Sequence, residues 1–112
     1  MNVSFNGCGT EVATFMTDGK YEKGTPVYSA DNGKVSSKEG QGILGFVISS
    51  DDSYAAVCYR GIITVPCIGD TTPLGKNYIN IGKGGKAVIS DEGREVYIIS
   101  ADKEAGTITI LL

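Results

Sequence analysis

The feature that most constrains this 112-residue chain is an internal repeat, in which a series of short strand and turn motifs occurs twice in the same order. Corresponding motifs are separated by about 51 or 52 residues throughout. A repeat at a fixed separation is typical of a duplicated supersecondary unit. The first series occupies residues 24–28, 33–35, 45–47, 49–51 and 54–57, and the second occupies residues 75–79, 85–87, 97–99, 100–102 and 106–109.

The residues that fill the repeat favour strands over helices. Val, Ile and Thr together make up 30 of the 112 residues, whereas Leu occurs four times and Gly 16 times. Side chains branched at Cβ lose rotamer freedom in a helix but pack well on a pleated sheet. Alternation over residues 107–112 predicts a half-buried strand, and the Asn32-Gly33 pair predicts a tight hairpin turn with positive φ angles. We therefore expect an all-β fold.

The size of the repeat bears on the architecture. A unit of about 51 residues is too small to bury its apolar face alone, so we expect pseudo-repeats over residues 23–60 and 75–112 to form one small barrel or sandwich within a single β domain, residues 23–112. Residues 60–66 predict a further strand that ends at Pro66, because proline cannot donate to a sheet ladder. Residues 1–22 form either an N-terminal arm or an edge strand, through residues 12–16, that closes the same barrel.

The charge balance bears on the class of partner. The formal net charge is −3 at pH 7 and the sequence pI is about 4.8, with both signs mixed along the chain. Because a protein that binds a phosphate backbone normally carries a basic face, we expect no nucleic-acid partner. No apolar stretch approaches the roughly 18 residues of a membrane helix, so we also expect no membrane partner and synthesis in a cytoplasm.

The cysteines and the absence of histidine limit the chemistry that the chain can perform. Cys8, Cys58 and Cys67 form an odd set without a C-x-x-C pair, which favours reduced thiols over a disulfide scaffold. Their spacing gives no zinc-ligand motif, and we expect Cys58 to be a small core residue. No Ser or Cys can be given a histidine as its base. We predict no catalytic residue, no metal and no cofactor.

Two polar motifs have a functional and a structural interpretation. Residues 82–86, Gly-Lys-Gly-Gly-Lys, could bind phosphate, but they lack the Ser or Thr and the helix of a phosphate-binding loop. The pairs Asp51-Asp52 and Asp91-Glu92 could bind calcium, but the spacing of a calcium loop is absent. Turns are favoured in both cases.

The six tyrosines also admit two interpretations. Stacked on an exposed face, they could bind single-stranded nucleic acid or sugars in an SH3-like or OB-like binding module. Such a module would expose Tyr54, Tyr59 and Tyr78 together. Packing in and around the core is favoured. The tyrosines are Tyr21, Tyr28, Tyr54, Tyr59, Tyr78 and Tyr97.

An ordered series of motifs runs through residues 20–112: Lys23-Gly24-Thr25-Pro26-Val27-Tyr28, Gly33-Lys34-Val35, Gly45-Phe46-Val47, Arg60-Gly61-Ile62-Ile63-Thr64-Val65-Pro66 and, closing the second copy, Thr107-Ile108-Thr109-Ile110-Leu111-Leu112. The series resembles the small capsid decoration proteins of tailed phages, and it is also similar to phage head fibre proteins. The family pattern opens a strand with G-x-P-V after a short arm and places a further strand between two repeats. In the second copy, Tyr97 stands where the first has Gly45.

The resemblance implies a structural virion protein, not an enzyme, that is made in the host cytoplasm and binds the outer surface of an assembled capsid. Its partner would be the major capsid protein, and a homotrimer is expected because decoration proteins often occupy local three-fold points. The apolar residues of the N-terminal segment are the expected capsid contacts: Phe5, Val12, Phe15 and Met16. The alternative is a free β-barrel module that binds a peptide, sugar or nucleic acid.

Overall fold

The computed structural model describes residues 11–69 and 74–112, which consist almost entirely of strands and turns. The expected all-β fold is confirmed. The first five strands are β1 (Glu11–Thr17), β2 (Pro26–Asp31), β3 (Lys34–Ser36), β4 (Gly45–Ser50) and β5 (Tyr54–Arg60). The next five are β6 (Ile62–Ile68), β7 (Gly75–Ile81), β8 (Ala87–Ser90), β9 (Arg94–Asp102) and β10 (Thr107–Leu111). A short 3-10 turn, η1 (Lys83–Gly85), lies between β7 and β8.

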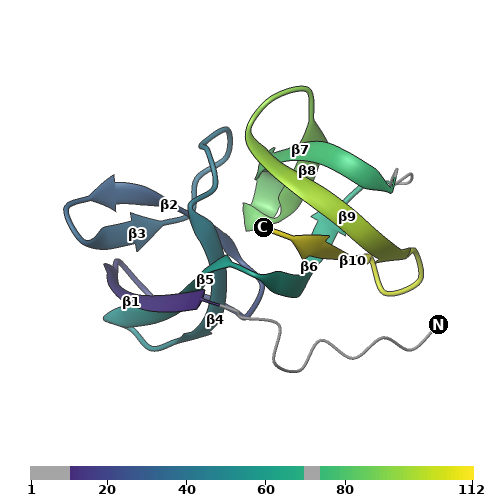
Figure 1. Cartoon of the computed structure of the whole chain (residues 1–112). Helices are drawn as coiled ribbons and strands as arrows, with labels where there is room; N and C mark the ends of the chain where they lie inside the picture. The colour runs from purple at the N-terminus through teal and green to yellow at the C-terminus, as the bar shows by residue number, and fades with distance from the viewer. Residues whose placement is uncertain (1–10, 70–73) are drawn as a thin grey trace.

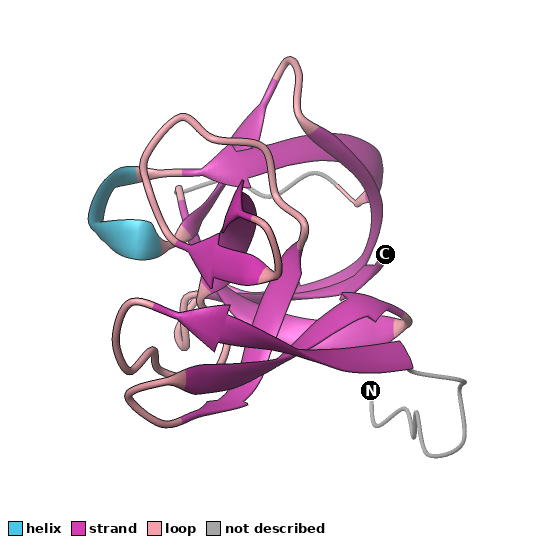
Figure 2. Ribbon diagram, turned by 90° about the vertical axis from the view of Figure 1, so that its left-hand side faces the viewer, coloured by secondary structure: helices cyan, strands magenta, loops and turns pink. Residues whose placement is uncertain are grey.

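The strands close into two barrels of the same topology. In barrel 1 (residues 11–60) the strand order is β1-β3-β2-β4-β5, and in barrel 2 (residues 62–112) it is β6-β8-β7-β9-β10. In each barrel the first strand pairs in parallel with the third, and the other neighbours are antiparallel. The barrels lie side by side, with β5 leading directly into β6 (Figure 1 and Figure 2).

Each pseudo-repeat therefore closes its own barrel, whereas the sequence led us to expect a common one. The difference comes from β1, which pairs with β3 and β5 as β6 pairs with β8 and β10. With β1 included, each duplicated unit has five strands, and five strands are enough to form a closed barrel. Residues 12–16 thus form the expected alternative, a strand of the barrel. Residues 60–66, which the sequence pattern places between the two repeats, contain the start of β6, the first strand of the second repeat.

The two barrels share a hydrophobic core. Barrel 1 encloses a cluster of its own, whereas Ile43 and Phe46 of barrel 1 belong to the larger cluster of barrel 2. The loop that carries Ile43 also bonds to β7 through its backbone, with Gly40 N–H donating to Ile81 O at 2.8 Å. The barrels are therefore one packed unit. The barrel 1 cluster is Val27, Val35, Val47, Ala55 and Val57; the fully buried members from barrel 2 include Val65, Ile79, Ala87, Ile98 and Ile110.

Two local expectations are modified by the strand pairing. The Asn32-Gly33 turn is present, but only Gly33 has a positive φ angle (69°), so the turn is not of the type that needs two. Strand β6 continues through Pro66 to Ile68. Cys67 N–H donates to Gly106 O beside β10, and the N–H groups of successive strand residues point in opposite directions. The ring nitrogen of Pro66 therefore faces β8, whose pairing with β6 begins only at Cys67. No hydrogen bond of the sheet is lost because proline lacks an N–H group.

Candidate functional site

The strand registers place two equivalent rows of cross-strand neighbours on the two barrels. Directly paired residues of adjacent strands point to the same face of a sheet. Row 1 crosses β2, β4, β5 and β1 and consists of Pro26, Phe46, Cys58 and Val12. Row 2 crosses β7, β9, β10 and β6 in the same order and consists of Lys76, Tyr97, Leu111 and Ile62.

The two rows differ in what covers them. Phe46 and Cys58 in row 1 are 0% exposed, and Phe46 packs in the core cluster of barrel 2. Their counterparts in row 2, Tyr97 and Leu111, are 55% and 45% exposed. The same position of the same fold is thus buried under a neighbouring barrel in one repeat and open in the other. Adjacent exposed apolar side chains of this kind are typical of a contact surface.

This register also corrects the alignment of the repeats. Tyr97 corresponds to Phe46 and not to Gly45, because Phe46 pairs with β2 and β5 and Tyr97 pairs with the equivalent strands β7 and β10, whereas Gly45 pairs with β2 alone. Gly45 itself has a packing role. A Cβ atom at this position would lie 2.4 Å from the backbone oxygen of Cys58.

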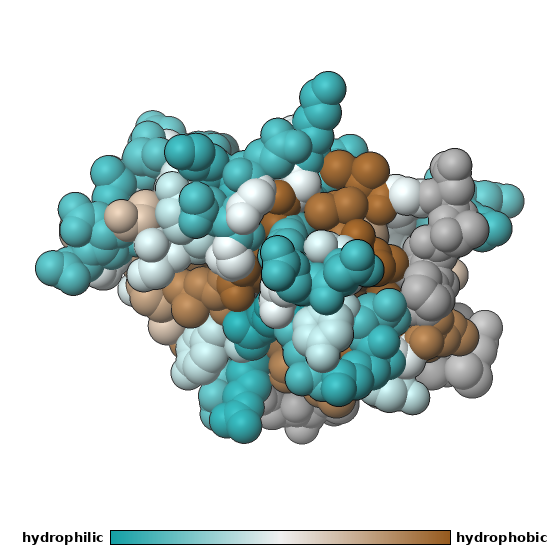
Figure 3. Space-filling view, turned by 90° about the horizontal axis from the view of Figure 1, so that it is seen from above, coloured by the Kyte–Doolittle hydropathy of each residue, from teal (hydrophilic) through white to brown (hydrophobic). Residues whose placement is uncertain are grey.

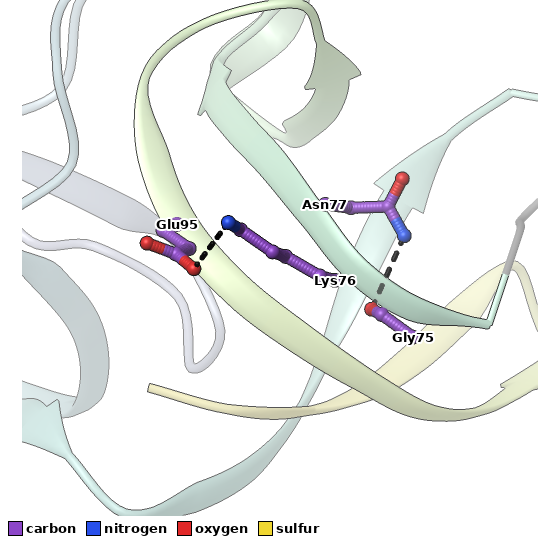
Figure 4. A network of polar contacts seen from close by, with 4 residues as sticks. All are labelled: Gly75, Lys76, Asn77 and Glu95. Atoms are coloured by element: carbon purple, nitrogen blue, oxygen red, sulfur yellow. Dashed lines mark hydrogen bonds and ion pairs between the residues drawn. The ribbon is translucent and has the colours of Figure 1, made fainter.

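Row 2 has a polar margin. Lys76 Nζ lies 3.3 Å from Glu95 Oε1 (Figure 4). It also lies 5.9 Å from the centre of the Tyr78 ring. The hydrogen bond and the charge of Glu95 raise the pKa of Lys76. Because both charged side chains are largely exposed, this ion pair holds Lys76 and Glu95 together beside row 2 and contributes little to the stability of the fold.

A shallow hollow of about 310 Å³ connects the two rows. Its lining includes Cys58 from row 1 and Ile62 from row 2, together with Ile48 and Ile63. Burial raises the pKa of the Cys58 thiol, which is typical of an unreactive core cysteine, and its expected place in the core is confirmed. The hollow extends row 2 toward barrel 1.

The expected capsid contacts lie on and beside row 1. Val12 and Met16 are each 46% exposed, and Met16 pairs directly with the exposed Tyr54 on β5. We call Val12, Met16 and Tyr54 the β1 patch. Phe15 points the other way: it is half-buried and packs against the cluster of barrel 1. Phe5 lies outside the described residues.

The acidic and glycine-rich motifs lie in turns. Asp51 Oδ1 accepts the N–H groups of Ser53 and Tyr54, both at 2.8 Å, and these bonds lower the pKa of Asp51. Asp102 makes the same turn in barrel 2, where its Oδ1 accepts Glu104 N–H and Ala105 N–H at 3.1 Å. Residues 82–86 form the turn between β7 and β8, and Asp91 and Glu92 precede β9.

The tyrosines do not form the platform that a stacking site needs. Tyr54 and Tyr59 lie at opposite ends of β5, Tyr78 belongs to barrel 2, and Tyr28 packs against the shared core. Seen from above, hydrophobic residues gather near the middle of the face, with hydrophilic residues around them (Figure 3). Within residues 11–69 and 74–112, no group of three His, Cys, Asp or Glu side chains could hold a metal ion. The same residues include no helix long and apolar enough to cross a membrane.

A scan against protein-family models and a search of curated proteins both gave no match to this chain.

Proposed function

We propose that this chain is a structural, non-enzymatic protein that attaches to a larger protein assembly through row 2 and the adjoining hollow. The observation that carries the proposal is the contrast between equivalent positions: Phe46 and Cys58 in row 1 are buried, whereas Tyr97 and Leu111 in row 2 are exposed. An apolar pair bordered by Lys76 and Glu95 suits a protein–protein contact with a polar rim.

The assembly that we propose is the outer surface of a tailed-phage head, and the contacted chain is its major capsid protein. The resemblance of residues 20–112 to capsid decoration and head fibre proteins supports this choice. Contacts of modest affinity suffice on such a lattice, because copies joined as a homotrimer would bind at several neighbouring sites together. A protein that binds the assembled shell, and not its free subunits, would stabilise the assembled state of the shell.

The proposal is tested by cosedimentation of the full chain with purified phage heads. We expect the Tyr97→Glu and Leu111→Glu variants to remain in the supernatant, because each places a charge within the apolar contact. Met16→Glu is the matched control, since Met16 is equally exposed but lies in the β1 patch. Circular dichroism of each variant checks that it is folded.

The outcomes separate the two surfaces and the two functions. Loss of binding in Met16→Glu alone would move the contact to the β1 patch and reject row 2. The decoration function would be rejected in favour of a free binding module if the folded wild-type chain bound no phage head but bound an oligosaccharide or single-stranded DNA with measurable affinity.

A further inference from the structure

A crevice between the two barrels brings together residues from distant parts of the sequence. It lies where residues 20–25 of barrel 1 meet the β7–β8 turn of barrel 2. Two adjoining hollows of about 390 and 80 Å³ share Glu22, Thr25, Gly84 and Gly85 in their walls. Lys20 and Ser37 line the larger hollow, whereas Lys23 and Lys86 line the smaller one.

The crevice carries an excess of positive charge. Three lysines, Lys20, Lys23 and Lys86, face one acidic residue, Glu22, which gives a net charge of +2. The ion pair found among the described residues, Lys76–Glu95, lies elsewhere on barrel 2, so none of these lysines has a carboxylate within ion-pair distance in that part of the chain. The crevice therefore has cationic side chains available for a ligand.

The backbone of the turn adds a concave surface. Gly84 and Gly85 have φ angles of +74° and +73°, a left-handed conformation that glycine adopts without steric cost. Gly85 N–H donates to Gly82 O at 3.2 Å and closes the turn. A glycine also lets a ligand approach the backbone closely, because it has no Cβ atom.

A buried hydroxyl group gives the crevice an unsatisfied donor. Ser37 Oγ is buried and has no hydrogen-bond partner in the structure. It lies beside the turn, 3.4 Å from the position that a Cβ atom of Gly85 would occupy. Because a buried hydroxyl without a partner is costly, an oxygen atom of a ligand at this position would be stabilising.

We infer that this crevice binds a tetrahedral oxyanion, phosphate or sulfate, between the two barrels. Lys20 in the larger hollow and Lys86 in the smaller one supply positive charge, the Gly84–Gly85 turn lets a ligand approach the backbone closely, and Ser37 Oγ donates a hydrogen bond. The inference is separate from attachment to a phage head, since no residue of row 2 lines the crevice; Lys23, which also lines the hollow beside row 2, is left unchanged in the test.

The test is a titration of the uniformly ¹⁵N-labelled full chain with sodium phosphate or sodium sulfate at neutral pH, against sodium chloride at matched ionic strength. We expect saturable amide shifts at Ser37, Gly84 and Gly85 with both oxyanions and not with chloride. Lys20→Ala and Lys86→Ala should each weaken binding by about tenfold, the loss of one charge-assisted hydrogen bond. The matched controls, Lys76→Ala and Lys103→Ala, should bind as the wild type does.

A further variant, Ser37→Ala, tests whether the Ser37 hydroxyl binds the ligand or stabilises the fold. Ser37→Ala removes a hydroxyl that has no partner in the protein, so its melting temperature should not fall, whereas its affinity for phosphate should. The inference is overturned if phosphate causes no saturable shift at these amides. It is equally overturned if Lys20→Ala, Lys86→Ala and Ser37→Ala all bind phosphate as tightly as the controls do.

Discussion

Among single residues, Arg94 makes the most direct polar connection between the barrels. From the start of β9, its guanidinium group donates to Leu44 O at 2.8 Å and to Tyr59 O at 2.7 Å, both in barrel 1. Burial lowers the pKa of Arg94, but an arginine remains charged at neutral pH. One residue of barrel 2 thus holds two segments of barrel 1.

We expect Arg94→Met to lower the free energy of unfolding by about 2 kcal/mol, because hydrogen bonds from a charged donor are lost and the carbonyl groups are left beside an apolar side chain. Urea denaturation measures the change. Arg60→Met is the matched control, since Arg60 is exposed, and it should change stability little. Equal effects of the two substitutions would contradict the proposed connection.

Gly45 tests the close approach of β4 to β5. Gly45→Ala should destabilise the fold by about 1–3 kcal/mol, because the added Cβ atom would meet the backbone oxygen of Cys58 at 2.4 Å and force the strands apart. Gly19→Ala is the control: its Cβ atom would meet nothing within 4 Å, and its φ angle is not in the left-handed region. A thermal melt that shifts no further for Gly45→Ala than for Gly19→Ala would refute this packing role.

Asp18 gives the protein a specific pH dependence. Its carboxylate accepts hydrogen bonds from the Tyr21 hydroxyl and from Ser36 Oγ, and the bond from Tyr21 is the main cause of its lowered pKa. A lowered pKa in the folded state stabilises the fold above the unfolded value of 3.8, and this contribution is lost as the pH falls through the lower folded value.

The Asp18→Asn variant should therefore be less stable than the wild type at neutral pH, and the difference should shrink as the pH falls below about 4. The effect is small, because Asp18 is exposed. Denaturation of both proteins over a pH series checks it. A stability difference that stays constant down to the acid limit would show that the carboxylate charge plays no part.

Short-range sequence patterns predict where strands and turns lie, but they do not predict which strands pair with one another. The Asn32-Gly33 turn and the strand at residues 107–112 follow from short-range patterns, and both are present. The sequence pattern places β1 outside the repeat, because its residues, Glu-Val-Ala-Thr-Phe-Met-Thr, share little with the Ile-Ile-Thr-Val-Pro-Cys-Ile of β6. Its equivalence to β6 appears only in the registers with the third and fifth strands.

The equivalent rows give a prediction about β4 and β9. Phe46→Ala should cost about 3–5 kcal/mol of stability, because it opens a cavity in the shared core, whereas Tyr97→Ala at the equivalent position should change stability by less than about 0.5 kcal/mol. Chemical denaturation of the two variants measures both values. A large loss in Tyr97→Ala would show that row 2 is covered, and it would remove the basis for a contact surface there.

For the whole molecule, the sequence indicated the duplication but neither the two rows nor the crevice. Row 2 joins residues 62, 76, 97 and 111, and the crevice joins Lys20 to Lys86, so both depend on how the chain closes twice. Alternation gave the correct all-β class because it is local. The strong apolar character of Phe46 signalled burial, but nothing in its own repeat shows that the covering surface is the other barrel.

The shared core predicts how the molecule unfolds. Barrel 1 has a cluster of five buried residues of its own and contributes Phe46 to the larger cluster of barrel 2, so we expect both barrels to unfold in one transition. Native-state hydrogen exchange should give Val47 and Val57 of barrel 1 the same opening free energy as Ile98 and Ile110 of barrel 2. Phe46→Ala weakens this link, although Ile43 and Arg94 still connect the barrels, so amides of barrel 1 should then exchange through an opening of lower free energy than those of barrel 2. If the wild type already shows two opening free energies, Phe46 fills space in the core of barrel 2 without coupling it to barrel 1.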